Sequence, residues 1–394
     1  MKTAMPAPQP LVRRFMPELD VLRGIAVLGV LLFHGFRAEY GDWAFTGVRK
    51  IFVFVTQFGV LGVNLFFVLS GFLITGILLD SRSRPDYYGR FYTRRALRIL
   101  PAYYSLLILL GVLHQASGAF LGLSFVYLSN MTSLFNVSMD YHPLWSLAVE
   151  EHYYIVWPSV VRKLRARWLA LLSLGLCVAV PLLRAVAFHY GYFEGREWYT
   201  WFSADGLAEG SLLALVLRTQ VSRKSAAAGA ILLMSMAAVM VVAGAPLGLA
   251  SRQSALGASL QLTLVNTFFS GLLLFFLVLG SGSWRHLVDS ATLQFFGYIS
   301  YGLYLFHPLT FRLYDKFVKA FWPELQPTLA QFHLIVVRFV IVSTVAVGVS
   351  YLSRRYYEEW FLRLKDRLAP EPAEVPVKVV LTTPPAPVTA REAS

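Results

Sequence analysis

The stretch LDVLRGIAVLGVLLFHGF, residues 19–36, decides how the rest of the sequence is interpreted. It is apolar over nearly the ~20 residues that a helix needs to cross a bilayer. Yet it carries Arg23 near one end and His34 near the other, and ionisable side chains are costly in hydrocarbon. The two positions are 11 residues apart, just over three helical turns, so they share one face about 16 Å apart along the axis. This arrangement predicts a cavity or a partner along that face rather than lipid.

The composition of the whole chain extends this interpretation to a membrane protein. Of 394 residues, 57% are hydrophobic and 14% are charged, whereas a soluble domain carries about 25% charged residues. The net charge is +13, but the charges lie between apolar blocks, so we do not expect nucleic acid as a partner. The single cysteine, Cys177, excludes a disulfide framework, and we predict no metal site.

Long apolar runs predict the fold class, an all-α polytopic membrane protein with about ten transmembrane helices. The predicted spans start near Arg23, Ile51, Leu100, Trp145, Trp168, Trp201, Ala226, Leu260, Phe295 and His333. The connecting segments on one side carry 22 basic residues and those on the other side carry 8. Basic loops stay in the cytoplasm, so this bias predicts that both termini are cytoplasmic.

The same pattern divides the chain into three parts. Residues 1–17 form a cytoplasmic N-terminal segment, and residues 18–368 form the transmembrane domain. Residues 369–394 are rich in proline, and we predict a disordered cytoplasmic tail there because such a composition cannot bury a core.

Five further motifs follow the opening stretch in order. They are GVNLFFVLSGFLITG (62–76), FYTRRALRILPAYY (91–104), LWSLAVEEHYYIVWP (144–158), ISYGLYLFHP (299–308) and SYLSRRYYEEWF (350–361). Together with the opening stretch they resemble the acyltransferase-3 family of integral membrane acyltransferases, in its stand-alone form without a fused soluble esterase-like domain. Two positions depart from the family pattern: His152 replaces an expected glutamine or other polar residue, and EEWF lacks a proline after the final glutamate.

The resemblance implies a reaction and a place for it. The family transfers an acyl group, acetyl in the simplest case, from cytoplasmic acyl-CoA to a hydroxyl of a carbohydrate or a glycosylated metabolite. It implies acyl-CoA as a co-substrate, no permanently bound cofactor, and a multi-pass location in the bacterial cytoplasmic (inner) membrane. His34 occupies the position that the resemblance marks as catalytic, and an imidazole titrates near the pH at which a hydroxyl must be deprotonated.

A neutral imidazole acts well as a base when a partner fixes its second nitrogen. Glu150 is the candidate for this orienting role, because it follows Ser146 by four residues and belongs to the predicted outer end of its span, as His34 does. The alternative is that Glu150 and Glu151 only meet water at a helix start, where the dipole favours anions.

Basic residues at the inner edge suit a polyanionic donor. We predict that Arg23, Arg94, Arg95 and Arg98 bind acyl-CoA, since a planar guanidinium can bind phosphate through two bonds. Arg94 and Arg98 lie four residues apart, where like charges repel unless an anion neutralises them. The alternative is simple anchoring of the inner loop.

The acceptor pocket is predicted at Ser146, Asp205 and His307, polar residues within three apolar spans. Ser70–Phe72 is more typical of close helix packing by small residues than of a nucleophile. A competing function, a transporter or flippase for an acylated metabolite or glycan, fits the same spans. Release of free thiol from acetyl-CoA distinguishes the two.

Overall fold

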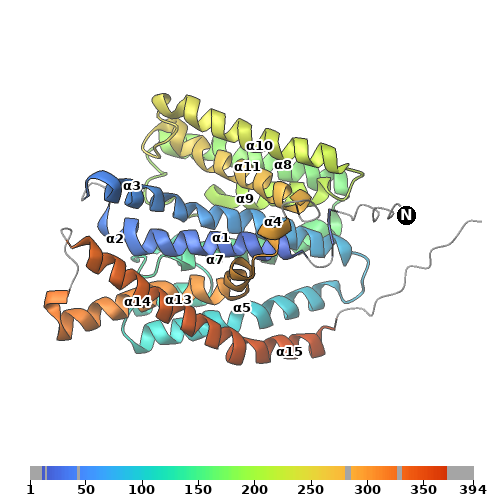
Figure 1. The fold of residues 1–394 in the computed structure, drawn as a ribbon. Helices are drawn as coiled ribbons and strands as arrows, with labels where there is room; N and C mark the ends of the chain where they lie inside the picture. The colour runs from blue at the N-terminus through green and yellow to red at the C-terminus, as the bar shows by residue number, and fades with distance from the viewer. Residues whose placement is uncertain (1–10, 14–15, 42–44, 280–284, 326–330, 371–394) are drawn as a thin grey trace, which may run out of the picture.

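The computed structural model describes residues 11–13, 16–41, 45–279, 285–325 and 331–370, and every regular element within them is helical (Figure 1). The α-helices are α1 Pro17–Leu32, α2 Ala38–Tyr40, α3 Gly47–Thr56, α4 Gly62–Asp80, α5 Tyr87–Val112, α6 Gly118–Phe125, α7 Leu144–Lys163, α8 Ala166–His189, α9 Thr200–Val216, α10 Arg223–Gly244, α11 Ala255–Leu279, α12 Arg285–Val288, α13 Ala291–Phe321, α14 Phe332–Leu352 and α15 Glu359–Leu368. Short 3₁₀ turns are η2 Gln57–Leu61, η3 Ser129–Phe135, η4 Ala245–Leu247 and η5 Pro323–Leu325, and π-helical turns are η1 Phe33–Arg37 and η6 Ser353–Glu358.

All ten predicted spans fall on long helices, and the all-α polytopic fold is confirmed. Within the described residues, seven helical stretches are long and apolar enough to cross a membrane, namely Pro17–Tyr40, Gly47–Asp80, Tyr87–Val112, Ala166–His189, Arg223–Leu247, Ala255–Leu279 and Phe332–Leu368. The other three predicted spans coincide with α7, α9 and α13. Of these three helices, α9 has only 17 residues, and α7 and α13 carry the buried hydrogen-bonding groups described below.

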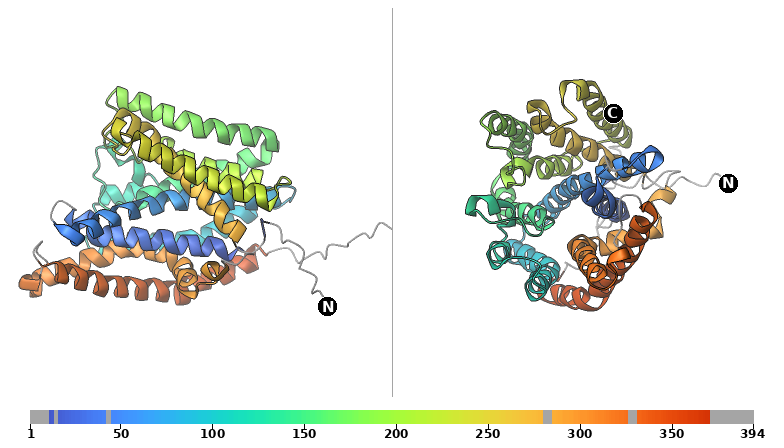
Figure 2. Two further views of the ribbon diagram at one scale, coloured as in Figure 1. Left: turned by 45° about the horizontal axis from the view of Figure 1, so that its top comes forward. Right: turned by 90° about the vertical axis from the view of Figure 1, so that its left-hand side faces the viewer.

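The long helices run side by side along one axis (Figure 1). Viewed end-on, α1 and α4 lie near the middle and the later helices surround them (Figure 2). The first helix packs most closely on α13 and also on α4. This central position explains why α1 can carry Arg23 and His34, since its polar face meets other helices instead of lipid.

Glycines allow two of the central helix pairs to approach closely. A Cβ at Gly24 of α1 would lie 2.2 Å from the Leu293 carbonyl oxygen of α13, and one at Gly71 of α4 would lie 2.0 Å from the Leu207 oxygen of α9. Any larger residue would force these backbones apart. The predicted packing role of the segment around Gly71 is therefore confirmed.

The two π-helical turns were not predicted from the sequence. One, η1, follows α1 and contains His34, and the other, η6, follows α14 and contains Arg354 and Glu358. Such turns insert an extra residue into a helix and are frequent at functional sites.

The predicted terminal segments fall largely outside the described residues. The first helix begins at Pro17 and α15 ends at Leu368, next to the predicted boundaries. Residues 1–10, 14–15 and 371–394, which make up most of the predicted N-terminal segment and tail, are not among the described residues.

Candidate active site

His34 meets a second histidine at the end of α1. Its Nδ1 lies 2.9 Å from the Val30 carbonyl oxygen and 3.2 Å from Nε2 of His307 on α13. The Nδ1 of His307 lies 2.8 Å from the Leu303 carbonyl oxygen. His307 is 1% exposed, whereas His34 keeps part of its surface accessible. Of the two rings, His34 is therefore the one that a substrate can reach.

The backbone contacts assign the protons on both rings. A ring nitrogen that faces a carbonyl oxygen must carry hydrogen, so the Nδ1 of His307 donates to Leu303 and its Nε2 is an acceptor. By the same rule, the Nδ1–H of His34 donates to Val30 and is shared with the Nε2 of His307. The Nε2 of His34 then carries the lone pair. This is the tautomer that a general base requires.

A buried tyrosine fixes the turn of α13 that carries His307. Pro308 interrupts the helix there because proline has no N–H to donate. The Tyr141 hydroxyl inserts into the broken ladder, donating to the Leu305 carbonyl oxygen at 2.7 Å and accepting from the Leu309 N–H at 3.1 Å. Tyr141 is fully buried. The segment before α7 thus supports the histidine pair from behind.

The structure does not bring Glu150 to His34, contrary to the prediction from the sequence. The Tyr154 hydroxyl donates to Glu150 at 2.5 Å, and Arg95 approaches the same carboxylate at 3.7 Å. Ser146, one turn before Glu150, bonds the Tyr304 hydroxyl at 2.6 Å, and α7 and α13 run in opposite directions. Along the bundle axis, Glu150 lies one turn beyond Ser146 in one direction, and His307 lies one turn beyond Tyr304 in the other. The helical rise over these two turns separates Glu150 from the histidine pair by about 10 Å.

The N-terminal end of α1, which we call the inner end, is surrounded by guanidinium groups; we call the end near His34 the outer end. Arg23 forms an ion pair with Asp20 at 2.7 Å. Arg98 of α5 lies close enough to Arg23, Arg95 and Arg354 to feel their positive charges. Arg98 is nevertheless exposed, and within the described part of the chain it forms neither a hydrogen bond nor an ion pair. Asp20 also acts on Arg98, but an accessible guanidinium without a partner of its own has the chemistry to bind an anion.

The other two predicted arginines differ in their surroundings. Arg95 lies 3.4 Å above the Tyr154 ring and approaches both Glu150 and Glu151, at 3.7 and 4.0 Å. Its charge is therefore partly compensated. Arg94 points to α15, where it bonds the Ala369 carbonyl oxygen at 2.7 Å and contacts Asp366. The structure thus groups Arg23, Arg95 and Arg98 and directs Arg94 elsewhere.

Arg354 completes this group of cations, which we call the arginine cluster: Arg23, Arg95, Arg98 and Arg354. Arg354 was not predicted from the sequence, although it lies in the motif SYLSRRYYEEWF. Its ion pair with Glu359, at 3.0 Å, holds it at the π-helical turn η6.

The predicted acceptor residues do not form one pocket. His307 contacts His34 directly, and Ser146 is 4% exposed and bonded to Tyr304, so it supports α13. Asp205 is 1% exposed and accepts from Thr263 at 2.7 Å and from Arg184 of α8. Arg184 is fully buried and was not predicted from the sequence. A lone arginine within an apolar span is the signal that could have identified it.

A third histidine lies at the outer end of this region. His142 precedes α7 and is close enough to His34 to interact with it electrostatically. Partial enclosure, together with the positive charge of Arg312, lowers the pKa of the His142 imidazole. His142 is therefore neutral around pH 7 and adds no positive charge beside His34.

The chain is similar to known proteins over most of its length. The profile of a family described as "Acyltransferase domain" matches residues 16–354. A putative peptidoglycan O-acetyltransferase, YrhL of Bacillus subtilis, is 34% identical over 232 residues, which is 52% of this chain and 33% of that protein. The peptidoglycan O-acetyltransferase OatA of Listeria monocytogenes is 32% identical over 247 residues, 55% of this chain and 37% of that protein.

A putative O-acetyltransferase of Staphylococcus aureus, SAS0844, is 31% identical over 225 residues, 52% of this chain and 34% of that protein. The matched segments thus span about a third of the length of these relatives. No solved structure matches the chain significantly.

Proposed function

The chain belongs to the acyltransferase-3 family, and from this premise we propose that it is a membrane-bound O-acyltransferase. It transfers an acyl group, acetyl in the simplest case, from acyl-CoA to a hydroxyl of a carbohydrate. The observation that carries the proposal is the state of His34, which is accessible, fixed at Nδ1 by Val30 and His307, and free to accept a proton at Nε2.

The chemistry follows from that nitrogen. The Nε2 of His34 takes the proton of the acceptor hydroxyl while the oxygen attacks the thioester carbonyl carbon. The new C–O bond forms, the C–S bond breaks, and the thiolate of coenzyme A leaves with the electron pair. The thiolate then takes the proton from the imidazolium, so His34 returns to its neutral form and no net proton is released.

The arginine cluster suits the phosphates of the donor. It lies at the end of α1 opposite His34, and Arg23 and His34 are 11 residues apart, or about 16 Å along the helix. That span is comparable to the extended pantetheine arm of coenzyme A. The thioester of a donor held at Arg98 can thus lie near His34, and one helix carries both the phosphate end and the reacting end.

The proposed location is a bacterial cytoplasmic membrane with the arginine cluster and both termini on the cytoplasmic side, where acyl-CoA is available. The bias of 22 basic residues against 8 in the connecting segments supports this orientation. A reporter that is active only in the cytoplasm, fused after Ser394, should give a signal. A silent fusion that is well expressed contradicts the orientation.

The acceptor class comes from the relatives, two of which are named for O-acetylation of peptidoglycan. We propose a cell-envelope carbohydrate as the acceptor. The test is the release of free thiol when the purified protein meets acetyl-CoA and soluble peptidoglycan fragments, with mass spectrometry of the products. A product heavier by one acetyl group supports the proposal, and thiol release that does not depend on the fragments contradicts it.

A further inference from the structure

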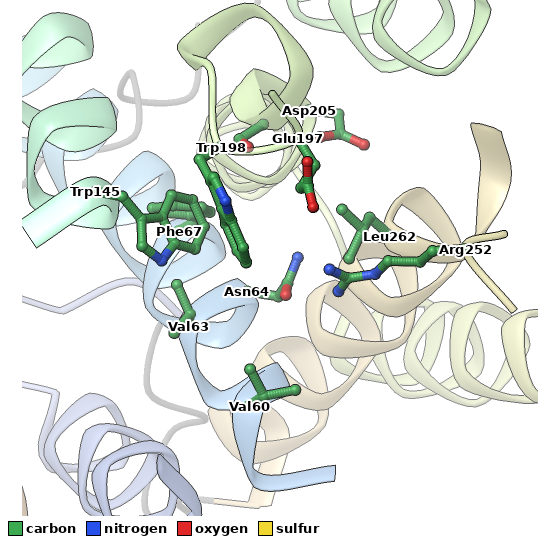
Figure 3. Close-up of a pocket in the computed structure, with 11 residues that line it drawn as sticks. Val60, Val63, Asn64, Phe67, Trp145, Glu197, Trp198, Asp205, Arg252 and Leu262 are labelled. Carbon is green, nitrogen blue, oxygen red and sulfur yellow. The ribbon is translucent and has the colours of Figure 1, made fainter. Parts of the chain in front are cut away.

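A polar pocket lies where α4 meets α7, α9 and α11 (Figure 3). Its lining comes from η2, α4, α7, α9, α11 and the segments preceding α9 and α11. The residues that matter for the argument are Asn64, Phe67, Trp145, Glu197, Trp198 and Arg252. We propose that this pocket binds the hydroxyl edge of a sugar in the acceptor glycan, adjacent to the sugar that reacts. The inference rests on the proposed function.

Aromatic rings form one wall of the pocket. The Trp145 and Trp198 rings lie 4.8 Å apart between centroids, and Phe67 meets Trp145 edge-on at 5.7 Å. Tryptophan is common where helices meet the membrane surface, facing lipid headgroups. These two rings instead face a pocket between helices (Figure 3). A flat apolar wall beside polar groups is suited to a ring that has C–H groups on its face and hydroxyls on its edge.

Polar groups converge on the opposite side. In Figure 3 the Glu197 carboxylate, the Arg252 guanidinium and the Asn64 amide point toward one another. The Oε2 atom of Glu197 is buried and has no hydrogen-bond partner among the residues that the structure describes. Burying an unpaired acceptor is costly, and a ligand hydroxyl that donates to it removes the cost.

The charges distinguish this pocket from the arginine cluster. Glu197 attracts Arg252 electrostatically, and Asp205, which also lines the pocket, pairs with Arg184. Two carboxylates thus lie beside the two arginines of this region, whereas three arginines, Asp20 and Glu358 act on Arg98. A balanced pocket favours an uncharged, hydroxyl-rich group over a phosphate.

The size of the pocket limits what enters it. The cavity volume is about 30 Å³, on a measure by which one water molecule needs about 10–15 Å³. A whole pyranose ring does not fit, but one hydroxyl with its carbon does. The rest of the ring then lies over the tryptophans at the mouth.

One buried apolar cluster adjoins both the pocket and His34. Val63 and Phe67 of α4 belong to the same buried apolar cluster as Val30 of α1 and Tyr304 of α13. Val30 holds the His34 ring, and Tyr304 lies one turn before His307. The proposal that one sugar binds at the pocket while its neighbour reacts at His34 predicts a preference for oligosaccharides over monosaccharides.

The direct test uses saturation-transfer NMR to measure binding of the trimer of N-acetylglucosamine to the purified full-length protein. We expect saturation of the sugar ring protons by the native protein. Trp198→Ala should abolish the signal, and Glu197→Gln should weaken affinity about tenfold, because a bond to a charged acceptor is roughly twice as strong as a neutral one. Trp168→Ala is the matched control, since Trp168 is 50% exposed near the start of α8, and it should bind normally.

The outcomes separate this inference from the proposed function. Absence of acetyl transfer by the native protein contradicts the proposed function, and the NMR experiment still tests the pocket. Native-like trimer binding by both Glu197→Gln and Trp198→Ala overturns the inference even where acetyl transfer is intact. Thermal stability is measured for each variant. Where Trp198→Ala does not fold, Glu197→Gln and Asn64→Ala decide, and unchanged binding in both overturns the inference.

Discussion

The two ends of α1 hold two chemically different sites. At the inner end Arg98 is exposed among Arg23, Arg95 and Arg354, and charge dominates. At the outer end two neutral imidazoles lie 3.2 Å apart, and the Nδ1 of each is held by a backbone carbonyl of its own helix. The first arrangement suits a polyanion, as we propose for the donor, with little demand on geometry, whereas the second suits the transfer of one proton at a fixed position. Salt should therefore perturb the first and pH the second.

The largest expected effect is at His34. His34→Ala should lower kcat by about 10²- to 10⁴-fold, the usual contribution of a general base, with donor binding unchanged. His34→Gln should not rescue turnover, because an amide cannot take the proton. Turnover of the native protein should rise with pH as the imidazole loses its proton, since only the neutral form is a base. The measurement is thiol release per folded molecule over a range of pH.

The control for His34 is His189→Gln, an exposed histidine at the end of α8. It should keep native turnover. If His34→Gln also keeps near-native turnover, His34 has a structural role and is not the base. The outer end then no longer differs from the inner end by carrying a proton-transfer site.

The next effect, at Arg98, should appear in donor binding rather than in kcat. Arg98→Ala should raise the KM for acetyl-CoA by about 10- to 100-fold, as expected for the loss of a hydrogen bond to a charged group. The salt dependence of donor binding should weaken as well. Arg94→Ala is the comparison, because Arg94 bonds Ala369 and Asp366 instead. Equal effects in both variants would return Arg98 to an anchoring role.

Much of this contrast was predictable from the sequence. The apolar runs placed all ten long helices, and the 11-residue spacing placed Arg23 and His34 at the two ends of one helix. Spacing along a helix is local, so folding changes it little, and here only the π-helical turn at His34 departs from it. The arginines before Pro101 were also identified, and three of the four predicted cations meet near α1.

The partners could not be predicted in the same way. Glu150 lies on the expected helix but at the wrong depth, because a span assignment gives the side of the membrane and not the register between two helices. His307 follows His34 by 273 positions and meets it only because α1 packs on α13. The π-helical turn at His34 lacks a sequence signature comparable to a proline or a cap.

A smaller effect is expected at His307, which touches the base rather than the substrate. His307→Asn should lower kcat about 10-fold, because the shared acceptor for the Nδ1–H of His34 is lost while the bond to Val30 remains. The KM for acetyl-CoA should not change, since the arginine cluster is untouched. Steady-state kinetics at saturating acceptor measure both. A rise in donor KM without a fall in kcat would place His307 with the inner end instead.

The smallest effect tests whether the outer end depends on geometry. Tyr141→Phe removes the hydroxyl that bridges the Leu305 carbonyl and the Leu309 N–H, so two buried backbone groups lose their partner. This should cost about 1–3 kcal/mol of stability. It should also lower kcat a few-fold, because the turn of α13 that carries His307 loses its support, and leave the KM for acetyl-CoA unchanged.

A second buried tyrosine separates positioning from stability alone. Tyr103 is also fully buried and donates one hydrogen bond, to the Ser124 carbonyl oxygen at 2.8 Å, but it does not touch the broken ladder of α13. Tyr103→Phe should therefore lower the melting temperature without lowering kcat per folded molecule. A fall in kcat in Tyr141→Phe alone identifies Tyr141 as a positioning residue, acting on His34 through His307. Equal kcat in the two variants would mean that the histidine pair keeps its geometry without the Tyr141 hydroxyl. Turnover at the outer end would then not depend on this support, contrary to the contrast drawn with the inner end.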